Sequence, residues 1–497
     1  MITQRFNNNT LFILLYLAIA GLILIYMNGL FTDYEIRGGG GENLEMSYFL
    51  YTEGVLALKR DSTGTPIPTN YREPVPPIIN AAFMYLHPGI SQDASLESFK
   101  DGENTKKVKK VNLFWLLLLQ LGVGYLTYIL TKNKYLPFLS LLLVLIYFIR
   151  FGGHFDTLLT ELPAATIIIW TTIFLIRSAK EKNWINDLIL GLLLGILILT
   201  KAMYFYLGLL ILIPLFFFMP REKRIAKAAI ILGATLLVVT PWLIRNYAVY
   251  DKMRITLRGG ESTYNRMLLN KMENEEIKGA VYLWSPALYK SLVKNTALDV
   301  DENEYLLGGK YQRLIRYPVM DYHAIALRMP EKTISYHSRV RAEENRQEYK
   351  YQQMGFDSNK ARLLAHSEMK DEAIDWILTH PIEHASMTLL FIWRSIWCFP
   401  NSTIPIISDQ LQQYIHNIIN LISYLTIFIV FVAGVYKRNL KMVALTLIPV
   451  VSLVFLVSVS HALPRYTEPF IPSMLVSVVF LIFLISKNLS GKWSSRV

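Results

Sequence analysis

The stretch Leu11–Phe31, LFILLYLAIAGLILIYMNGLF, decides the fold class. It carries no charged side chain, and about 20 apolar residues are enough to cross the hydrocarbon core of a bilayer as a helix. It is too long for the core of a signal peptide, and no small-residue cleavage pattern follows it. We therefore interpret it as an uncleaved membrane anchor.

Similar apolar runs recur along the chain. Of its 497 residues, 53% are hydrophobic and 18% charged, and its mean hydropathy of +0.32 is typical of an integral membrane protein. The single cysteine, Cys398, excludes an internal disulfide and a thiolate cluster. We predict an all-α integral membrane protein with about ten transmembrane helices, near 11–30, 112–131, 135–149, 158–176, 186–200, 203–219, 226–244, 412–435, 442–459 and 469–486.

The positive charge fixes the expected orientation. With the N-terminus inside, the segments 1–10, 132–134, 177–187, 220–227, 436–441 and 487–497 are internal, and they hold 16 Lys/Arg against three acids. That excess exceeds the net charge of +12 and follows the positive-inside rule. Nucleic-acid binding is therefore not needed to explain the basic composition. Lys106, Lys107, Lys109 and Lys110 fall outside, where we expect them against lipid phosphates.

Three parts follow from this pattern. Residues 1–245 form a transmembrane module of seven spans with an outer loop over 31–110. Residues 246–411 form a non-cytoplasmic soluble domain that ends in an interfacial helix, and 412–497 carry spans eight to ten. In the soluble part, Ser358 is the expected N-cap of a helix that ends at His380-Pro381. In the outer loop we expect a flexible joint at Gly38–Gly41, a helix over Glu45–Lys59 and turns over Asp61–Asn70.

Polar side chains gather at the outer ends of the spans, and a bundle of helices would bring these ends to one cavity. An ionisable group at membrane depth is expensive, which favours a functional role for Glu161, about one turn into an apolar helix. The candidates are Asp33, Glu42, Glu45, Arg72, Glu73, His154, Asp156, Glu161, Lys201, Arg245, Tyr247, Arg465 and Tyr466.

Plainer interpretations stay open for several of them. Asp33 fits a solvated membrane edge, and Arg72 with Glu73 fits a surface ion pair. Arg245 and Arg465 fit side chains that extend to lipid headgroups. His154 and Asp156 have the spacing of half a metal site, without a matching second pair of ligands.

Carboxylates beside arginines suit one kind of chemistry. A carboxylate takes a proton from an acceptor hydroxyl as general base, and arginine binds phosphate through its planar fork of donors. The residues alone therefore indicate glycosyl transfer, phosphoryl transfer, or transport of an anionic lipid at the outer leaflet.

An ordered set of motifs resembles the polytopic GT-C glycosyltransferases, in the bacterial group related to protein O-mannosyltransferases and aminoarabinose transferases (glycosyltransferase family 39-like). The resemblance covers nearly the whole chain. Its motifs are Arg72-Glu73-Pro74-x-Pro76-Pro77, Thr160-Glu161-Leu162-Pro163, Thr200-Lys201, Pro241-Trp242-x-x-Arg245-Asn246-Tyr247 with Gly259-Gly260 and Tyr264, Ala373-Ile374 with His380-Pro381, Trp393 and Trp397, and Arg465-Tyr466-x-x-Pro469 with Pro472.

The resemblance implies a GT-C fold, a polyprenyl-phosphate-linked sugar donor and inverting transfer at the non-cytoplasmic face of a bacterial inner membrane. It implies no required cofactor, with a divalent metal left open, and a lipid, glycan or protein as acceptor. The family's first-loop acid is an Asp shortly before a Tyr, so here Glu45 ranks above Asp33, and Glu42 third, as the catalytic carboxylate. Glu161 would orient acceptor or donor, and the donor phosphate would bind Arg72, Lys201, Arg245 and Arg465.

Two other classes remain. A flippase or transporter of a polyprenyl-linked or anionic lipid would keep the arginines and need no acid–base carboxylate, although internal repeats common in transporters are not apparent. A membrane scaffold of a cell-envelope complex would bind no lipid phosphate.

Overall fold

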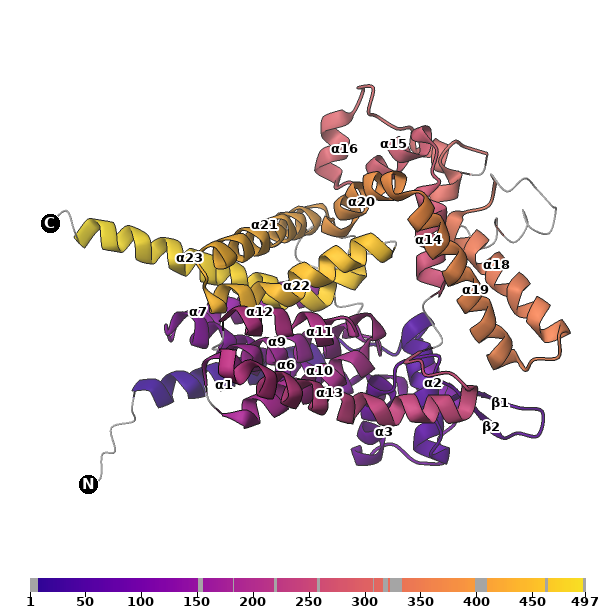
Figure 1. Ribbon diagram of the computed structural model, residues 1–497, viewed down its shortest axis with the longest axis horizontal. Helices are drawn as coiled ribbons and strands as arrows, with labels where there is room; N and C mark the ends of the chain where they lie inside the picture. The colour runs from indigo at the N-terminus through magenta and orange to yellow at the C-terminus, as the bar shows by residue number, and fades with distance from the viewer. Residues whose placement is uncertain are drawn as a thin grey trace.

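The computed structural model is almost entirely helical. It describes residues 8–150, 155–181, 183–218, 221–256, 260–306, 308–315, 321, 333–397, 409–460 and 464–494. Long helices lie side by side as a bundle, and both termini emerge at one end of it (Figure 1). The first outer loop and the helices α14 to α19 occupy the opposite end. The prediction of an all-α integral membrane protein is confirmed, apart from one small two-stranded sheet.

Seven of the described helices are long and apolar enough to cross a membrane. They lie in α1 (Asn8–Asn28), α5–α6 (Thr105–Lys109 and Val111–Thr131), α9 (Glu161–Lys180), α13 (Arg221–Tyr250), α21 (Asp409–Tyr436), α22 (Leu440–Val459) and η5–α23 (Pro464–Phe470 and Ile471–Ser494). Two expected spans are shorter apolar helices, α7 (Leu136–Arg150) and α10 (Trp184–Thr200).

The expected span over 203–219 is wrong as a continuous helix. It is divided into η1 (Ala202–Tyr204), α11 (Leu207–Leu210) and α12 (Leu212–Phe218). Pro214 has no backbone N–H to bond back to Leu210, so the helix restarts with proline in its first turn.

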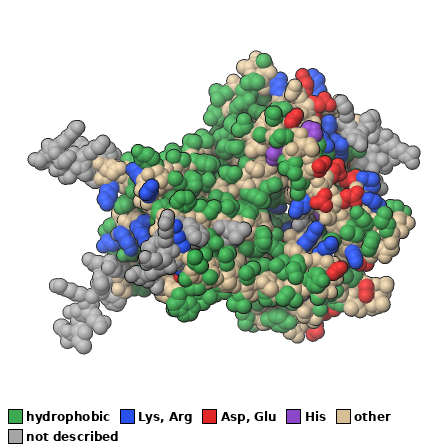
Figure 2. Space-filling model, in the orientation of Figure 1, with side chains coloured by type: hydrophobic (Ala, Val, Ile, Leu, Met, Phe, Trp, Pro, Cys, Tyr) green, Lys and Arg blue, Asp and Glu red, His purple; other side chains and the backbone are tan. Residues whose placement is uncertain are grey.

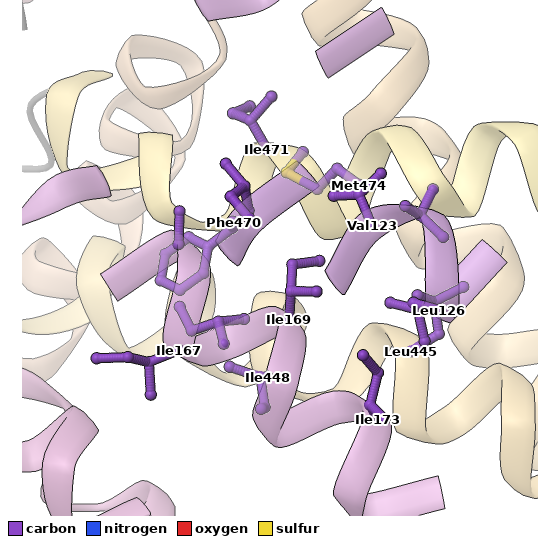
Figure 3. Packing of buried hydrophobic residues seen from close by; sticks show 14 of the residues in the cluster. Val123, Leu126, Ile167, Ile169, Ile173, Leu445, Ile448, Phe470, Ile471 and Met474 are labelled. Atoms are coloured by element: carbon purple, nitrogen blue, oxygen red, sulfur yellow. The ribbon is translucent and has the colours of Figure 1, made fainter. Parts of the chain in front are cut away.

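The core of the bundle lies where α6, α9, α22 and α23 meet. Figure 3 shows Val123, Ile169, Ile448 and Met474 from these four helices directed at one another, and all four are buried. Helix α9 carries apolar residues around its circumference because it is surrounded by other helices. Figure 2 shows the consequence at the surface: an apolar middle, basic side chains near the termini, and mixed charges at the opposite end.

The first outer loop folds as a compact unit rather than a flexible joint. It contains α2 (Gly38–Glu53), β1 (Ala57–Arg60) antiparallel to β2 (Pro66–Pro68), α3 (Val75–Leu86) and α4 (Leu96–Lys100). The expectation for Gly38–Gly41 is therefore wrong, because these glycines form the first turn of α2. A methyl group on Gly39 would lie 2.5 Å from Arg72 Nη2, and one on Gly40 would collide with Thr157 Oγ1. The helix expected over Glu45–Lys59 starts earlier and ends at Gly54 in the left-handed conformation.

The second outer unit is a set of helices packed on the end of the bundle. It comprises α14 (Gly260–Asn270), α15 (Asn274–Leu283), α16 (Ala287–Val293), η2 (Glu302–Tyr305), η3 (Gln312–Leu314), α18 (Tyr336–Gln353), α19 (Ser358–Thr379) and α20 (Pro381–Ile396). The N-cap of α19 is Asp357, one residue before the expected Ser358, because its carboxylate accepts the N–H groups of Asn359 and Lys360. The helix ends at His380-Pro381 as predicted.

Candidate functional site

A cavity of about 1020 Å³ lies between the two outer units and the start of the last span. Six of the described residues that line it are basic and two are acidic. The basic ones are Arg72, Lys290, Arg313, Arg341, Arg394 and Arg465, and the acids are Glu42 and Glu261. The wall also has polar edges, which come from Gly38, Gly39, Ser335, Tyr336, His337 and Tyr466. The cavity therefore suits a large ligand with an anionic group.

The first turn of α2 supplies Glu42 and places it against Arg72. Arg72 Nε donates to Glu42 Oε2 at 2.5 Å, and Nη2 forms an ion pair with the same oxygen. Both side chains are mostly buried, 16% exposed for Arg72 and 24% for Glu42. Gly39 permits this close approach because it has no Cβ to meet the guanidinium. A carboxylate and a guanidinium are thus in contact at the cavity wall.

The other two first-loop acids lie elsewhere. Glu45 Oε1 pairs with Lys100 Nζ at 2.7 Å, which ties α2 to α4. Asp33 is in the segment 31–37, which is neither helix nor strand and leads into α2. Among the described residues that line the cavity, Glu42 is the first-loop acid, whereas Glu45 and Asp33 are absent. The ranking of the three by sequence spacing therefore differs from their order of access to the cavity.

Asp156 anchors the start of the outer loop. Its carboxylate accepts the Thr32 backbone N–H at 3.0 Å and the Thr32 hydroxyl. Lys109 Nζ lies 3.2 Å from Asp156 Oδ1 and donates to the Thr32 and Tyr34 carbonyls, both at 2.9 Å. Lys109 is 1% exposed, so the expectation that it faces lipid phosphates is wrong. A buried ammonium needs such partners, and here they hold the loop on the bundle.

Glu161 joins two of the predicted cations. Its Oε1 is 3.3 Å from Lys201 Nζ and 3.4 Å from Arg465 Nε, and Glu161 is 5% exposed. It is the first residue of α9, not a turn inside it as expected. That position favours a carboxylate because the helix dipole is positive there. The Tyr466 ring lies beside both cations, with Lys201 Nζ 5.0 Å and Arg465 Cζ 5.4 Å from its centroid.

Three further predicted site residues either hold parts of the fold together or lie away from the large cavity. Glu73 Oε1 accepts the Ala202 backbone N–H at 2.8 Å, which fixes the first loop to the turn after α10. Arg245 lies 4.8 Å above the Trp242 ring centroid and donates to Asn246 Oδ1 at 2.9 Å. Tyr247 is half exposed and lines a separate hollow beside β2. Neither Arg245 nor Tyr247 is among the described residues that line the large cavity.

Sequence reasoning missed the cations of the second outer unit. Arg313 Nη1 lies 3.4 Å from Glu276 Oε1, and Arg341 pairs with Glu261 at 3.1 Å and Glu344 at 2.6 Å. Burial lowers the pKa of Lys290, and it lowers the pKa of Arg394 to about 10. Burial also acts to lower the pKa of Arg341, but Glu261 and Glu344 outweigh it and raise that pKa. These residues lie in a segment with balanced charge, so no local excess marked them.

The possible half metal site is described only in part. His154 lies outside the described residues, and Asp156 is bound to Thr32 and Lys109. Within the portions of the chain that the structure describes, no three His, Cys, Asp or Glu side chains are grouped so as to hold a metal ion.

Comparisons with known proteins add a distant likeness. No family model and no curated protein matches the chain. The chain is similar to solved structures of ArnT from Cupriavidus metallidurans, one in the apo state and one bound to undecaprenyl phosphate. The identities are 11% and 10%, the TM-scores 0.36 and 0.34, and the matches cover 95% of this chain and 78% and 77% of those chains. At this distance the glycosyltransferase assignment remains a proposal.

Proposed function

We propose that the protein is an inverting glycosyltransferase that moves a sugar from a polyprenyl-phosphate-linked donor to an acceptor at the non-cytoplasmic face of a bacterial inner membrane. The observation that carries the proposal is the basic cavity at the outer end of a membrane bundle, with Glu42 and Arg72 in contact on its wall. A lipid-linked phosphate reaches such a place from the bilayer, and arginine is the side chain best suited to hold it.

The reaction needs a base and a stabilised leaving group. Glu42 takes the proton of the acceptor hydroxyl as the acceptor oxygen bonds to the anomeric carbon of the sugar. The bond from that carbon to the phosphate oxygen breaks, and its electron pair leaves with the polyprenyl phosphate. The charge of the phosphate is stabilised by cations of the cavity, so no general acid is required. Attack opposite to the leaving group inverts the anomeric centre.

The contact between Glu42 and Arg72 gives an order to these events. While Arg72 donates to Glu42 Oε2, that oxygen is not available to an acceptor hydroxyl. A donor phosphate competes for the same guanidinium, because phosphate accepts the arginine fork as a carboxylate does. Donor binding therefore releases Glu42 Oε2 from Arg72, which makes this oxygen available to the acceptor. Arg465, which lies 3.4 Å from Glu161, supplies a second cation to the cavity wall.

The test compares three conservative variants of purified protein in nanodiscs: Glu42→Gln, Glu45→Gln and Asp33→Asn. Sugar transfer is followed with a panel of radiolabelled polyprenyl-phosphate sugars, and retention of undecaprenyl phosphate is measured by native mass spectrometry. Glu42→Gln should lower transfer by about 10²- to 10⁴-fold and keep lipid binding. Glu45→Gln and Asp33→Asn should retain most activity. Full activity of Glu42→Gln would refute its role as base.

Lipid binding without transfer by the wild-type protein, over the whole panel, would instead favour a lipid transporter. No retention of polyprenyl phosphate at all would refute the proposed donor class.

A further inference from the structure

Helix α16 has two unlike faces. Leu288 and Leu292, one turn apart, are 53% and 72% exposed. On the other side Val293 is buried, and the Tyr289 ring packs edge-on against Trp393 of α20 with centroids 5.8 Å apart. Lys290 also lies on that side, lines the large cavity and has its Nζ 5.1 Å from the Tyr282 ring centroid. One short helix therefore separates the cavity from the surroundings.

The exposed face of α16 continues the lipid-facing surface of a membrane span. Helix α16 contacts α21, and Figure 1 draws it beside the junction of α20 and α21. Helix α21 exposes large apolar residues at alternating spacings of four and three, namely Leu411, Ile415, Ile418, Ile422 and Leu425. A stripe with this spacing on a membrane span faces lipid. Helix α16, which carries Leu288 and Leu292, contacts the helix that bears this stripe, and its exposed face is apolar as well.

The charges around α16 fit the boundary between lipid chains and headgroups. Lys294, which follows the helix, is exposed, and lysine extends its ammonium from an apolar layer to the headgroup region. Behind the helix, Lys290 and Arg394 both line the cavity, and the Arg394 guanidinium lies 4.1 Å from the Trp284 ring centroid. An anionic headgroup that passes α16 from the bilayer meets these two cations first.

We propose that α16 is inserted into the leaflet beside the cavity, with Leu288 and Leu292 among the lipid chains, and that a polyprenyl phosphate enters the cavity past this helix and binds Lys290. The second half rests on the proposed function, because it takes the donor to be a phosphate lipid. The first half stands without it, on the apolar face of α16 and the contact of this helix with α21.

Insertion is tested by nitroxide labelling of single cysteines in nanodiscs. The sole native cysteine is replaced as Cys398→Ser, and labels are attached to Leu288→Cys and Leu292→Cys. Leu425→Cys on α21 is the lipid-exposed control, and Met354→Cys at the α18 end, 61% exposed, is the water-exposed control. Labels at 288 and 292 should relax with oxygen more than with a nickel chelate, as at 425. Accessibility like that at 354 would refute insertion.

Entry is tested by a matched pair of variants, Lys290→Gln and Lys294→Gln, each lowering the charge of this segment by one. Lys290→Gln should weaken retention of undecaprenyl phosphate about tenfold, a change easily resolved by titration. Lys294→Gln should retain wild-type binding. Equal binding by Lys290→Gln and the wild type would overturn the role of Lys290. If the wild type binds no polyprenyl phosphate, the proposed function fails, whereas the labelling experiment still decides insertion.

Discussion

Replacing Glu161 by Gln removes one negative charge from the point where Lys201 and Arg465 meet. Glu161 Oε1 lies 3.3 Å from Lys201 Nζ and 3.4 Å from Arg465 Nε. The Glu161 side chain is 6% exposed and that of Lys201 15%; the Arg465 side chain is 37% exposed, but its Nε atom, which faces Glu161, is buried. The substitution therefore leaves the Lys201 ammonium and the Arg465 Nε without their carboxylate in a largely dry place.

The expected magnitude follows from that burial. Removing one partner of a buried ion pair costs about 3–5 kcal/mol, because the other charge stays buried without compensation. Glutamine still accepts a hydrogen bond from Lys201, so we expect about 3 kcal/mol for Glu161→Gln, at the lower end. The free energy of unfolding is measured by SDS titration in mixed micelles.

A control variant and a double variant test whether the loss of stability comes from a buried cation left without its carboxylate. Glu181 pairs with Arg177 at the same 3.3 Å, but the two side chains are 45% and 34% exposed. Glu181→Gln should cost about 1 kcal/mol or less, since exposed pairs contribute little. Adding Lys201→Met to Glu161→Gln should recover much of the loss, because it removes the unpaired charge. A Glu161→Gln protein as stable as the wild type, or additive losses in the double variant, would refute the reasoning.

Three further predictions concern the outer units. Gly40→Ala should destabilise the first outer loop by about 1–3 kcal/mol, because a methyl group there would collide with Thr157 Oγ1 and lie 3.3 Å from the Leu158 backbone nitrogen. Gly21→Ala, where a methyl group meets nothing within 4 Å, should not, and equal melting of the two variants would contradict this. Lys109→Met leaves Asp156 buried without its cation, so hydrogen exchange over residues 29–37 should rise, and unchanged exchange would refute the anchor. Burial opposes ionisation of Glu344, yet His366 and Arg341 outweigh it and lower its pKa from 4.5 to about 2. From that shift, ionised Glu344 stabilises the folded protein by about 3 kcal/mol; this contribution is complete above pH 4.5 and is lost as the pH falls toward 2. The stability of Glu344→Gln should therefore depend less on pH in this range than that of the wild type. An unchanged acid-unfolding profile would disprove the linkage.

The sequence predicts the membrane bundle well because a membrane span requires a long apolar stretch, which is easily recognised. Apolar length identifies the spans, and His380-Pro381 marks the end of α19 where expected. The interrupted span near Pro214 shows the limit, since apolar composition alone does not say whether a helix is continuous. Glycines mislead in a similar way: Gly38–Gly41 has the composition of a linker but begins α2, and the proximity of Arg72 and Thr157 explains why residues without a Cβ stand there.

The site is less predictable because long-range pairing decides it. Glu45 has the better sequence spacing, but Lys100 lies within 2.7 Å and takes its carboxylate. Arg313 and Arg341 occur in a segment of balanced charge, and only the fold turns them toward the first outer loop. Asp156, singled out as a possible ligand, instead binds Thr32 across 124 positions of sequence. No local pattern records such partners.

The same pairings explain how the cavity wall holds so many cations. Arg72 is balanced by Glu42, Arg313 by Glu276, and Arg341 by Glu261 and Glu344. Each of these carboxylates competes with an incoming phosphate for its cation. Lys290 lies instead against the Tyr282 ring. A ring gives up a cation at lower cost than a carboxylate does, so under the proposed function an anionic headgroup should engage Lys290 first and Arg72 afterwards. This order would release Glu42 from Arg72 only after the donor is seated, so that proton abstraction would follow donor binding.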